Sequence, residues 1–444
     1  MLRNLDIIYS GECNMACTYC YIHKNKSRMV NYNKKIRDSI DDGSFSGSII
    51  KNFADYQDQL EHIALWGAEP TLNAEYFSKF AVPLFDYFPN LNEVMFSTNA
   101  LRGAEAIDMF ISTMNNYSKE HDRRMKLELQ FSLDGPDYIN DSSRHPGATR
   151  STLKAIKDVV TKYKDLDGKF TMTLTTKATL TTQWMEHLAD NPDKMLEYFQ
   201  FFAKLQHEME EISQTRNIRL YLTAYPTVVD PGEHVIEDGI RFAKFIKALR
   251  QVDVSKCSPY QHPLFLQCTK TYHINEYELT PPVGTYACAA GLASWSVDCE
   301  GNIMACHRTY DNLYMGTSLS ELFCDDTSTR GDSKNRLNLA MSRLDYQNRV
   351  FHRSQNSRRI FLSYILRGLV MAGQVDEKYL EPLMLEKLHR AIGDVTCFIG
   401  QGEMTGSIYL TTASYIHLFA HGALEELFDY YEETIFNPEE LYAY

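Results

Sequence analysis

Residues 5–21 read LDIIYSGECNMACTYCY, a short apolar run followed at once by a loop with three cysteines. The apolar run predicts a buried strand over Leu5–Tyr9. Cys13, Cys17 and Cys20 have the spacing C-x3-C-x2-C, which lets one loop wrap three thiolates around an iron–sulfur cluster, because soft thiolate ligands suit iron. A [4Fe–4S] cube has one iron more than these three ligands. The loop therefore predicts a cluster with one open coordination position.

Strand-like runs alternate with helix-like segments through the first half of the chain. Further strands are predicted over Glu61–Gly67, Glu93–Asn99, Leu127–Pro136 with its closing turn, Phe170–Thr176 and Ile218–Thr223. Helices are predicted over Tyr32–Gln59 with a break at Asp42-Gly43, over Asn73–Phe88, Ala104–Asn116 and Ser151–Lys164, and as two helices between Asp193 and Gln214. Strands that alternate with helices form a parallel sheet, and six βα units are fewer than those of a closed barrel. We therefore expect an α/β fold, a partial, open-sided (β/α)6 barrel of the TIM kind.

Polar residues follow the ends of several of these strands. Glu69, Asn99 and Asp134 come at the ends of the second, third and fourth predicted strands, as the cysteine loop follows the first. Active sites of parallel βα folds form at the carboxyl ends of the strands, because the βα loops converge there. We therefore expect these side chains and the cysteine loop to lie at one edge of the sheet.

The second half of the chain has a different character. A helix is predicted over Pro231–Val252, then a loop-rich segment over Cys257–Asp325, and helical segments from about Asn335 to Tyr444. The predicted domains are therefore a barrel over 1–235, a small cysteine-rich extension over 236–330 and a helical C-terminal domain over 331–444.

Composition excludes several classes of protein. The 444 residues carry a formal net charge of −13, and a nucleic-acid surface needs clustered Lys and Arg instead. No run approaches the roughly 20 consecutive apolar residues of a membrane helix, and the N-terminal apolar run is too short for a signal peptide. We expect a cytoplasmic protein without nucleic-acid or membrane partners. Because the chain starts directly at its first strand, no N-terminal domain that binds a peptide leader is expected.

The distribution of the ten cysteines indicates two metal centres. A disulfide framework is not expected in a reducing compartment. Three cysteines lie in the first loop, and six lie between Cys257 and Cys324, with none in the long segment between the two groups. The remaining Cys397 is interpreted as an inert thiol.

A zinc knuckle is the competing interpretation of the first cysteines, with His23 as a fourth ligand. Structural zinc does not explain the aromatic Tyr19 beside Cys20, or the position directly after a first barrel strand. The stretch resembles the signature of the radical S-adenosylmethionine (SAM) enzymes, C-x3-C-x-aromatic-C. The resemblance implies a [4Fe–4S] cluster on Cys13, Cys17 and Cys20, with SAM on the open iron and a flavodoxin- or ferredoxin-like electron donor. It also implies reductive cleavage of SAM to a 5′-deoxyadenosyl radical, which abstracts a substrate hydrogen.

Two further stretches extend this resemblance to the SAM site. Residues 65–70, LWGAEP, are similar to the Gly-Gly-Glu-Pro turn of the family, which holds the SAM amino group, with Ala68 in place of the second glycine. Residues 97–100, STNA, are similar to its Thr-Asn-Gly strand end. The implied cofactor-binding residues of these two stretches are Gly67, Ala68, Glu69, Pro70, Ser97 and Asn99.

Residues 132–136, SLDGP, followed by Asn140, Asp141 and Arg144, resemble a longer pattern. It belongs to the subgroup that modifies peptides and proteins, which includes the anaerobic sulfatase-maturating enzymes. The resemblance implies that Ser132 and the neighbouring Asp134 contact SAM and that Arg144 faces its carboxylate.

The later cysteines have a pattern of their own. Cys288 and Cys306 frame C-x12-G-x4-C, which resembles the opening of the SPASM or Twitch extension that carries auxiliary iron–sulfur clusters. A β-hairpin near Glu300-Gly301 would bring both cysteines to one site. The later C-x2-C-x5-C-x3-C segment of a full SPASM domain is absent, so one auxiliary cluster of the Twitch kind is expected. Its remaining ligands stay open among Cys257, Cys268, Cys299 and Cys324.

These observations predict hydrogen abstraction from a peptide or protein substrate, leading to oxidation, cross-linking or epimerisation. One alternative is a radical SAM enzyme that acts on a small molecule such as a carbohydrate or nucleoside. Another is a non-catalytic zinc-binding adaptor. No residue of the sequence identifies a substrate acid or base.

Overall fold

The computed structural model describes residues 2–20, 32–222, 226–228, 241, 244–245, 248, 294–304, 317–318, 370–371 and 377–380. The chain divides into two compact units, the first with residues 1–179, 198–226 and 289–348, and the second with residues 180–197, 227–288 and 349–444. The predicted domain boundaries at 235/236 and 330/331 lie outside the described residues. So do most of the predicted cysteine-rich extension and of the predicted C-terminal helices.

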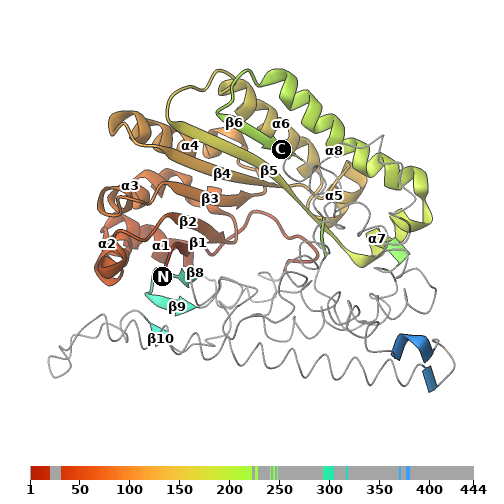
Figure 1. The fold of residues 1–444 in the computed structure, drawn as a ribbon, viewed down its shortest axis with the longest axis horizontal. Coiled ribbons are helices and arrows are strands. Elements are labelled where there is room, and N and C mark those ends of the chain that lie inside the picture. The colour runs from red at the N-terminus through yellow and green to blue at the C-terminus, as the bar shows by residue number, and fades with distance from the viewer. Residues whose placement is uncertain are drawn as a thin grey trace. The chain divides into compact units, whose positions relative to one another are not determined.

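A parallel sheet forms the centre of the first unit. Its strands β1 (Asn4–Ser10), β2 (His62–Gly67), β3 (Glu93–Thr98), β4 (Met125–Ser132), β5 (Phe170–Leu180) and β6 (Ile218–Tyr221) lie side by side in chain order, as Figure 1 shows. Each neighbouring pair is parallel. The predicted α/β fold with six consecutive parallel strands is therefore confirmed. A short strand, β7 (Pro226–Val228), follows β6.

The sheet continues beyond β1 with strands from much later in the chain. β8 (Ser294–Val297) pairs parallel with β1, and β9 (Asn302–Met304) and β10 (Thr317–Ser318) follow it in antiparallel order. β8 and β9 form the hairpin predicted near Glu300-Gly301, in which Gly301 has a φ of 83° and donates its N–H to Asp298 O at 3.2 Å. Part of the predicted extension thus belongs to the barrel sheet.

The described helices and 3-10 turns include two helices, over residues 137–143 and 182–190, that were not predicted from the sequence. In chain order, the described helices and turns are α1 (Tyr32–Asp41), α2 (Ser44–Asn52), the 3-10 turns η2 (Ala54–Tyr56) and η3 (Pro70–Tyr76), α3 (Phe77–Tyr87), α4 (Gly103–Glu120), α5 (Asp137–Ser143), α6 (Ala148–Lys162), α7 (Thr182–Asp190), α8 (Pro192–Ile212) and η7 (Glu377–Leu380).

Three helix predictions need correction. The helix predicted over Asn73–Phe88 is η3 followed by α3, because Asn73 has non-helical angles of φ −117° and ψ 23°. The two helices predicted between Asp193 and Gln214 are the single helix α8, which contains no glycine or internal proline to break it. The turn predicted after Asp134 leads directly into α5, whose N-cap is Pro136.

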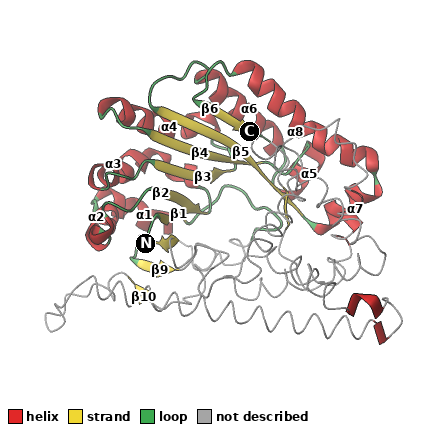
Figure 2. Ribbon diagram, viewed as in Figure 1, coloured by secondary structure: helices red, strands yellow, loops and turns green. Residues whose placement is uncertain are grey.

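Alternation along the strands separates two faces of the sheet. In β4 the residues Met125, Leu127, Leu129 and Phe131 are buried, and the residues between them are half exposed. The buried face packs under α3 and α4, as the ring centroids of Tyr9 and Phe80 at 5.4 Å and of Phe96 and Phe110 at 4.3 Å show. Figure 2 shows the helices along this side of the sheet. A fully buried ring of this size contributes roughly 2–3 kcal/mol.

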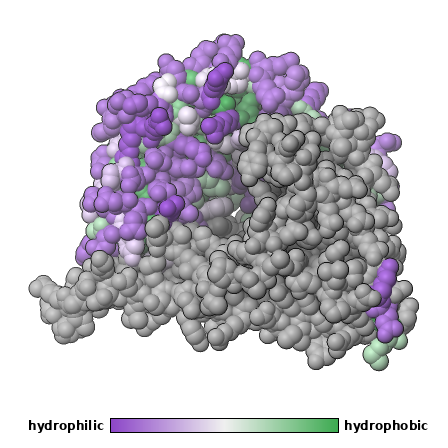
Figure 3. All heavy atoms as spheres, viewed as in Figure 1, coloured by the Kyte–Doolittle hydropathy of each residue, from purple (hydrophilic) through white to green (hydrophobic). Residues whose placement is uncertain are grey.

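The outer surface of the helical layer is mostly hydrophilic in Figure 3. In the part of the chain that the structure describes, no helix is long and apolar enough to cross a membrane. In the second unit, Glu186 and Asp190 of α7 pair with Arg241 and Lys244, at 3.1 and 2.6 Å.

Candidate functional site

The cysteine loop begins where β1 ends, at the carboxyl edge of the sheet. Cys13, Cys17 and Cys20 are free, half-buried thiols. A tight turn holds the second half of the loop, because Cys20 N donates to Cys17 O at 3.1 Å. The sequence prediction that these thiols share one loop after the first strand is therefore confirmed, and their role as ligands stays a prediction.

Main-chain hydrogen bonds hold this loop to the end of β2. Ala68 N donates to Ser10 O at 2.8 Å, and Glu69 N donates to Glu12 O at 3.0 Å. Gly67 has a φ of 112°, and a Cβ at this position would lie 1.9 Å from Ser10 O. Glycine is therefore required where β2 passes the start of the cysteine loop.

A buried asparagine on α1 holds the other side of the loop. Asn33 is fully buried, and its Oδ1 accepts the Gly11 N–H at 2.8 Å and lies 3.3 Å from Ser10 Oγ. A Cβ on Gly11 would come within 2.7 Å of the Tyr32 side chain. The sequence prediction did not include Asn33, since a single polar residue in a polar, helix-compatible stretch carries no signal of this contact.

Burial sets the protonation of the first two thiols of the loop. Burial raises the pKa of Cys13 to about 12, while a hydrogen bond from Met15 N opposes the shift and Glu69 adds to it. Burial also raises the pKa of Cys17, and the positive charge of Arg144 opposes that shift. A thiol of this kind ionises when a coordinated cation stabilises the thiolate. Three soft sulfur donors on one loop fit an iron–sulfur cluster.

The thiols do not converge on a single point. Among the described residues, no group of three or more His, Cys, Asp and Glu side chains is placed to hold one metal ion. A zinc ion needs sulfur ligands about 2.3 Å from the metal, and therefore close to one another. In a cube, by contrast, each cysteine binds a different iron. His23, the fourth ligand of the zinc alternative, lies outside the described residues.

Glu69 forms a brace between the ends of β2 and β3. Its side chain is 2% exposed, and Oε1 accepts the hydroxyls of Thr71 and Thr98 at 2.6 and 2.7 Å. The N–H of Thr71 also donates to Oε1 at 3.2 Å, and Asn99 N donates to Oε2 at 2.8 Å. Burial raises the pKa of Glu69, and these hydrogen bonds oppose the shift. The carboxylate thus accepts four hydrogen bonds from the protein, three on Oε1 and one on Oε2.

Asn99 connects the end of β3 to the cysteine loop. Its Nδ2 donates to Asn14 Oδ1 at 2.7 Å and lies 3.5 Å from Cys13 Sγ. Ala100, which stands where the family has glycine, adopts a φ of 57°. Ser97 donates to Gln130 Oε1 at 2.7 Å on the half-exposed face of the sheet. Asn99 therefore contacts the cysteine loop, whereas Ser97 lies on β3 itself, two residues earlier in the chain.

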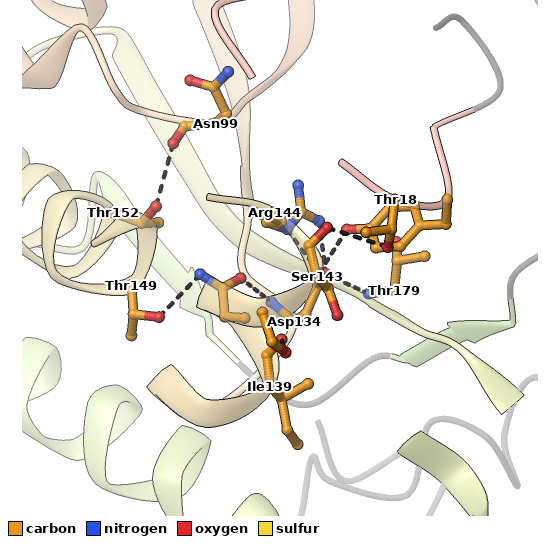
Figure 4. A network of polar contacts seen from close by, with 12 residues as sticks. Thr18, Asn99, Asp134, Ile139, Ser143, Arg144, Thr149, Thr152 and Thr179 are labelled. Atoms are coloured by element: carbon orange, nitrogen blue, oxygen red, sulfur yellow. Dashed lines mark hydrogen bonds and ion pairs between the residues drawn. The ribbon is translucent and has the colours of Figure 1, made fainter. Parts of the chain in front are cut away.

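Asp134 and Arg144 form a buried ion pair at the end of β4. Figure 4 shows Asp134 between Arg144 and Thr179. Arg144 Nη2 lies 2.6 Å from Oδ1, and Arg144 Nε lies 2.8 Å from Oδ2. Thr179 N and the Tyr19 hydroxyl donate to the same carboxylate at 2.8 and 2.5 Å. The expected contacts of Asp134 and Arg144 with SAM stay predictions, while these contacts to the protein are observed.

Ser132 is half exposed at the end of β4, on the face of the sheet opposite to the buried residues that pack under α3 and α4. It pairs in register with Lys177 of β5, and the ammonium of Lys177 lies 5.9 Å from the centroid of the Trp66 ring. The sequence prediction did not single out Trp66 or Lys177. The sequence shows that Trp66 lies on a predicted strand and that Lys177 directly follows another. Their contact depends on the curvature of the whole sheet, which the sequence pattern of a single strand does not show.

The predicted auxiliary site is described at one position. Cys299 is half buried after β8, and burial raises its pKa to about 11, with a hydrogen bond from Tyr32 opposing the shift. The other candidates lie outside the described residues: Cys257, Cys268, Cys288, Cys306 and Cys324.

No protein-family model matches the chain, and a search of curated proteins finds no match. Among solved structures, the chain is similar to anSMEcpe with bound AdoMet, with 17% identity over 69% of this chain and 74% of that chain, at a TM-score of 0.40. A structure of anSMEcpe with bound AdoMet and Cp18Cys peptide gives 18% identity, the same coverage of 69% and 74%, and a TM-score of 0.40. SuiB of Streptococcus suis, bound to S-adenosylmethionine, gives 13% identity over 70% of this chain and 61% of that chain, at a TM-score of 0.31.

Proposed function

We propose that this protein is a radical SAM enzyme that abstracts hydrogen from a peptide or protein substrate. The observation that carries the proposal is the edge of the sheet where Cys13, Cys17 and Cys20 lie. The same edge holds Glu69 and Asn99, which are bonded to each other and to the loop. Active sites of parallel βα folds form at this edge, and a protein that uses a cofactor supplies its binding and orientation there.

The three thiolates would hold the [4Fe–4S] cluster, and their loop would be fixed in place by β2, α1 and the end of β3. When bound, the cluster supplies the electron that cleaves SAM to a 5′-deoxyadenosyl radical. Asn99 Nδ2 lies 3.5 Å from Cys13 Sγ and would therefore lie beside this ligand of the cluster. The Glu69 carboxylate accepts hydrogen bonds from Thr71, Thr98 and Asn99. Glu69 would therefore act by holding the turn after β2 in place.

The proposed SAM site includes the remaining residues of the same edge. Gly67, Ala68 and Pro70 contribute the turn that follows β2, and the missing side chain of Gly67 lets this turn pass close to Ser10 O at the start of the cysteine loop. Ser97 and Ser132 are half exposed on the face of the sheet opposite to the buried residues that pack under α3 and α4. A ligand on this face would meet their hydroxyl groups.

The peptide or protein substrate is supported by the residue pattern from Ser132 to Arg144, which resembles the peptide-modifying subgroup. An auxiliary iron–sulfur cluster on Cys288, Cys306 and further cysteines from Cys268, Cys299 and Cys324 would complete the enzyme. A flavodoxin- or ferredoxin-like protein would supply electrons.

Metal analysis and SAM cleavage test the proposal. We expect iron and sulfide, and no zinc, in protein purified without oxygen, and 5′-deoxyadenosine on reduction with SAM present. Cys17→Ala should abolish 5′-deoxyadenosine formation, whereas Cys397→Ala, which changes an isolated cysteine, should retain it. Stoichiometric zinc without iron, or undiminished cleavage by Cys17→Ala, would overturn the proposal.

A further inference from the structure

We infer that Asp134 and Arg144 are a positioning pair that anchors Tyr19 and thereby sets the place and the charge environment of the second half of the cysteine loop. The inference rests on the proposed function only for its cluster, since the anchoring itself is a property of the polypeptide. It gives Asp134 and Arg144 a role through the protein and not through direct contact with SAM.

The acceptor capacity of Asp134 is filled by the protein. The side chain is 0% exposed, and its two oxygens accept hydrogen bonds from Tyr19, Arg144 and Thr179. Its backbone N–H donates to Asn140 Oδ1 at 2.8 Å, which fixes the residue from the other side. A carboxylate with this set of short, charge-assisted bonds has a single orientation.

The Arg144 side chain is also held by protein contacts. Its side chain is 7% exposed, and two of its nitrogens form the paired contact with Asp134. The guanidinium carbon also lies 5.5 Å from the centroid of the Tyr19 ring, a cation–π distance. Tyr19 is thus held at its hydroxyl by Asp134 and at its ring face by Arg144.

The main chain of the same segment reinforces this contact. Ser143, which directly precedes Arg144, accepts the Thr18 N–H at 2.9 Å, as Figure 4 shows. Thr18 and Tyr19 separate Cys17 from Cys20, so one short segment at the end of α5 holds both residues between these two thiols. The second half of the loop is therefore held by the end of α5, an element that the sequence prediction did not include.

The pair also balances charge near a thiol. The Arg144 guanidinium lies 5.5 Å from the ring centroid of Tyr19, which stands between Cys17 and Cys20 in the chain, and the Asp134 carboxylate neutralises it at 2.6 Å. Asp134→Asn would leave Arg144 charged, because guanidinium does not lose its proton in proteins. An uncompensated unit charge acting over about 10 Å at an effective dielectric constant of about 20 changes an equilibrium by about tenfold. Reduction adds negative charge to a cluster, so the lone cation should favour the reduced form.

Amide hydrogen exchange of the metal-free protein tests the anchor without any cluster. Tyr19→Phe removes the hydroxyl that donates to Asp134, and we expect about tenfold faster exchange in a peptide that covers residues 13–20. Tyr163→Phe is the matched control, because the Tyr163 hydroxyl also donates to an aspartate, Asp108, at 2.5 Å but far along the chain from the loop. Equal exchange of residues 13–20 in wild type and Tyr19→Phe would overturn the anchor.

Potentiometric titration of the cluster tests the charge role. We expect Asp134→Asn to shift the ratio of reduced to oxidised cluster by about tenfold toward reduced at a fixed potential, which is about 59 mV for one electron. The double variant Asp134→Asn/Arg144→Gln removes both charges and should return the midpoint potential toward wild type. A merely structural role would not give this reversal, so an unchanged potential in Asp134→Asn, or no return in the double variant, would overturn the charge role.

If Asp134→Asn fails to fold, the amide exchange of Tyr19→Phe still decides whether the pair anchors Tyr19. Absence of iron in the wild type would instead overturn the proposed function and leave the exchange result standing.

Discussion

Replacing Glu69 by glutamine should destabilise the junction between β2 and β3. The carboxylate accepts two backbone N–H groups, of Thr71 and Asn99, one on each oxygen. A glutamine amide has one oxygen, so either orientation leaves one of these N–H groups facing an NH2 group. A buried donor without an acceptor costs about 1–3 kcal/mol. We therefore expect the free energy of unfolding of Glu69→Gln to fall by about 1–3 kcal/mol.

Urea unfolding of the metal-free protein, followed by circular dichroism, measures this change. Glu128→Gln is a matched control on β4, because the Glu128 carboxyl makes no hydrogen bond or ion pair with any other described residue and burial raises its pKa. Neutralising it should change the free energy of unfolding by less than about 0.5 kcal/mol or stabilise the fold. Equal unfolding of Glu69→Gln and wild type would refute the brace, and equal losses in both variants would show a general effect of charge removal.

Three further results follow from individual contacts. Gly67→Ala should lower the free energy of unfolding in urea by more than about 3 kcal/mol, since the new Cβ would overlap Ser10 O. Gly103 is the control, because it has a φ of 73° with open space around it, and Gly103→Ala should lower the same free energy by only about 1–2 kcal/mol. Similar losses in the two variants would contradict the overlap. Arg123→Ala should lose about 2–3 kcal/mol because its guanidinium donates to the carbonyls of Phe85, Phe88 and Leu91, and the exposed neighbour Arg124→Ala should stay within about 0.5 kcal/mol. A hydrogen bond from Arg102 lowers the pKa of Glu75 in the folded protein. The pair therefore stabilises the fold above a pH of about 4.3, the pKa of a glutamate in the unfolded chain. This stabilisation is lost as the pH falls through the lower pKa that Glu75 has in the folded protein. Urea titrations from pH 3 to 7 should show Glu75→Gln less stable than wild type by under about 1 kcal/mol at pH 7, with the difference vanishing at the acid end; a difference that grows toward low pH would reverse the sign.

The strand order was predictable because each strand carries its own signal. β4 and β5 alternate buried and half-exposed residues over their length, and that period is visible in the letters alone. The β8–β9 hairpin was predictable for a similar reason, since Gly301 can take the positive φ that a tight turn needs. Local signals of this kind do not depend on the rest of the chain.

The contacts that assemble the site were not predictable in the same way. Arg144 was assigned to SAM by resemblance, and its ion pair with Asp134 depends on α5 turning the chain back over the cysteine loop. Glu69 was recognised as unusual at a strand end, but its partners Thr98 and Asn99 come from another strand. Such partners follow from the three-dimensional arrangement of strand ends, which no local pattern encodes.

The pairing of β1 with β8 has a consequence for synthesis of the chain. Asp6 and Ser296 lie 290 positions apart, and Ser296 Oγ lies 3.3 Å from an Asp6 carboxylate oxygen. At about 5–20 residues per second, the ribosome needs roughly 15–60 s to make the intervening chain. During that time, the strand that carries the cysteine loop has one edge without its final partner, which is the condition that favours pairing with a wrong strand. The thiol-bearing strand is thus made early and completed late, so correct assembly of the nascent protein depends on what protects its edge in the interval.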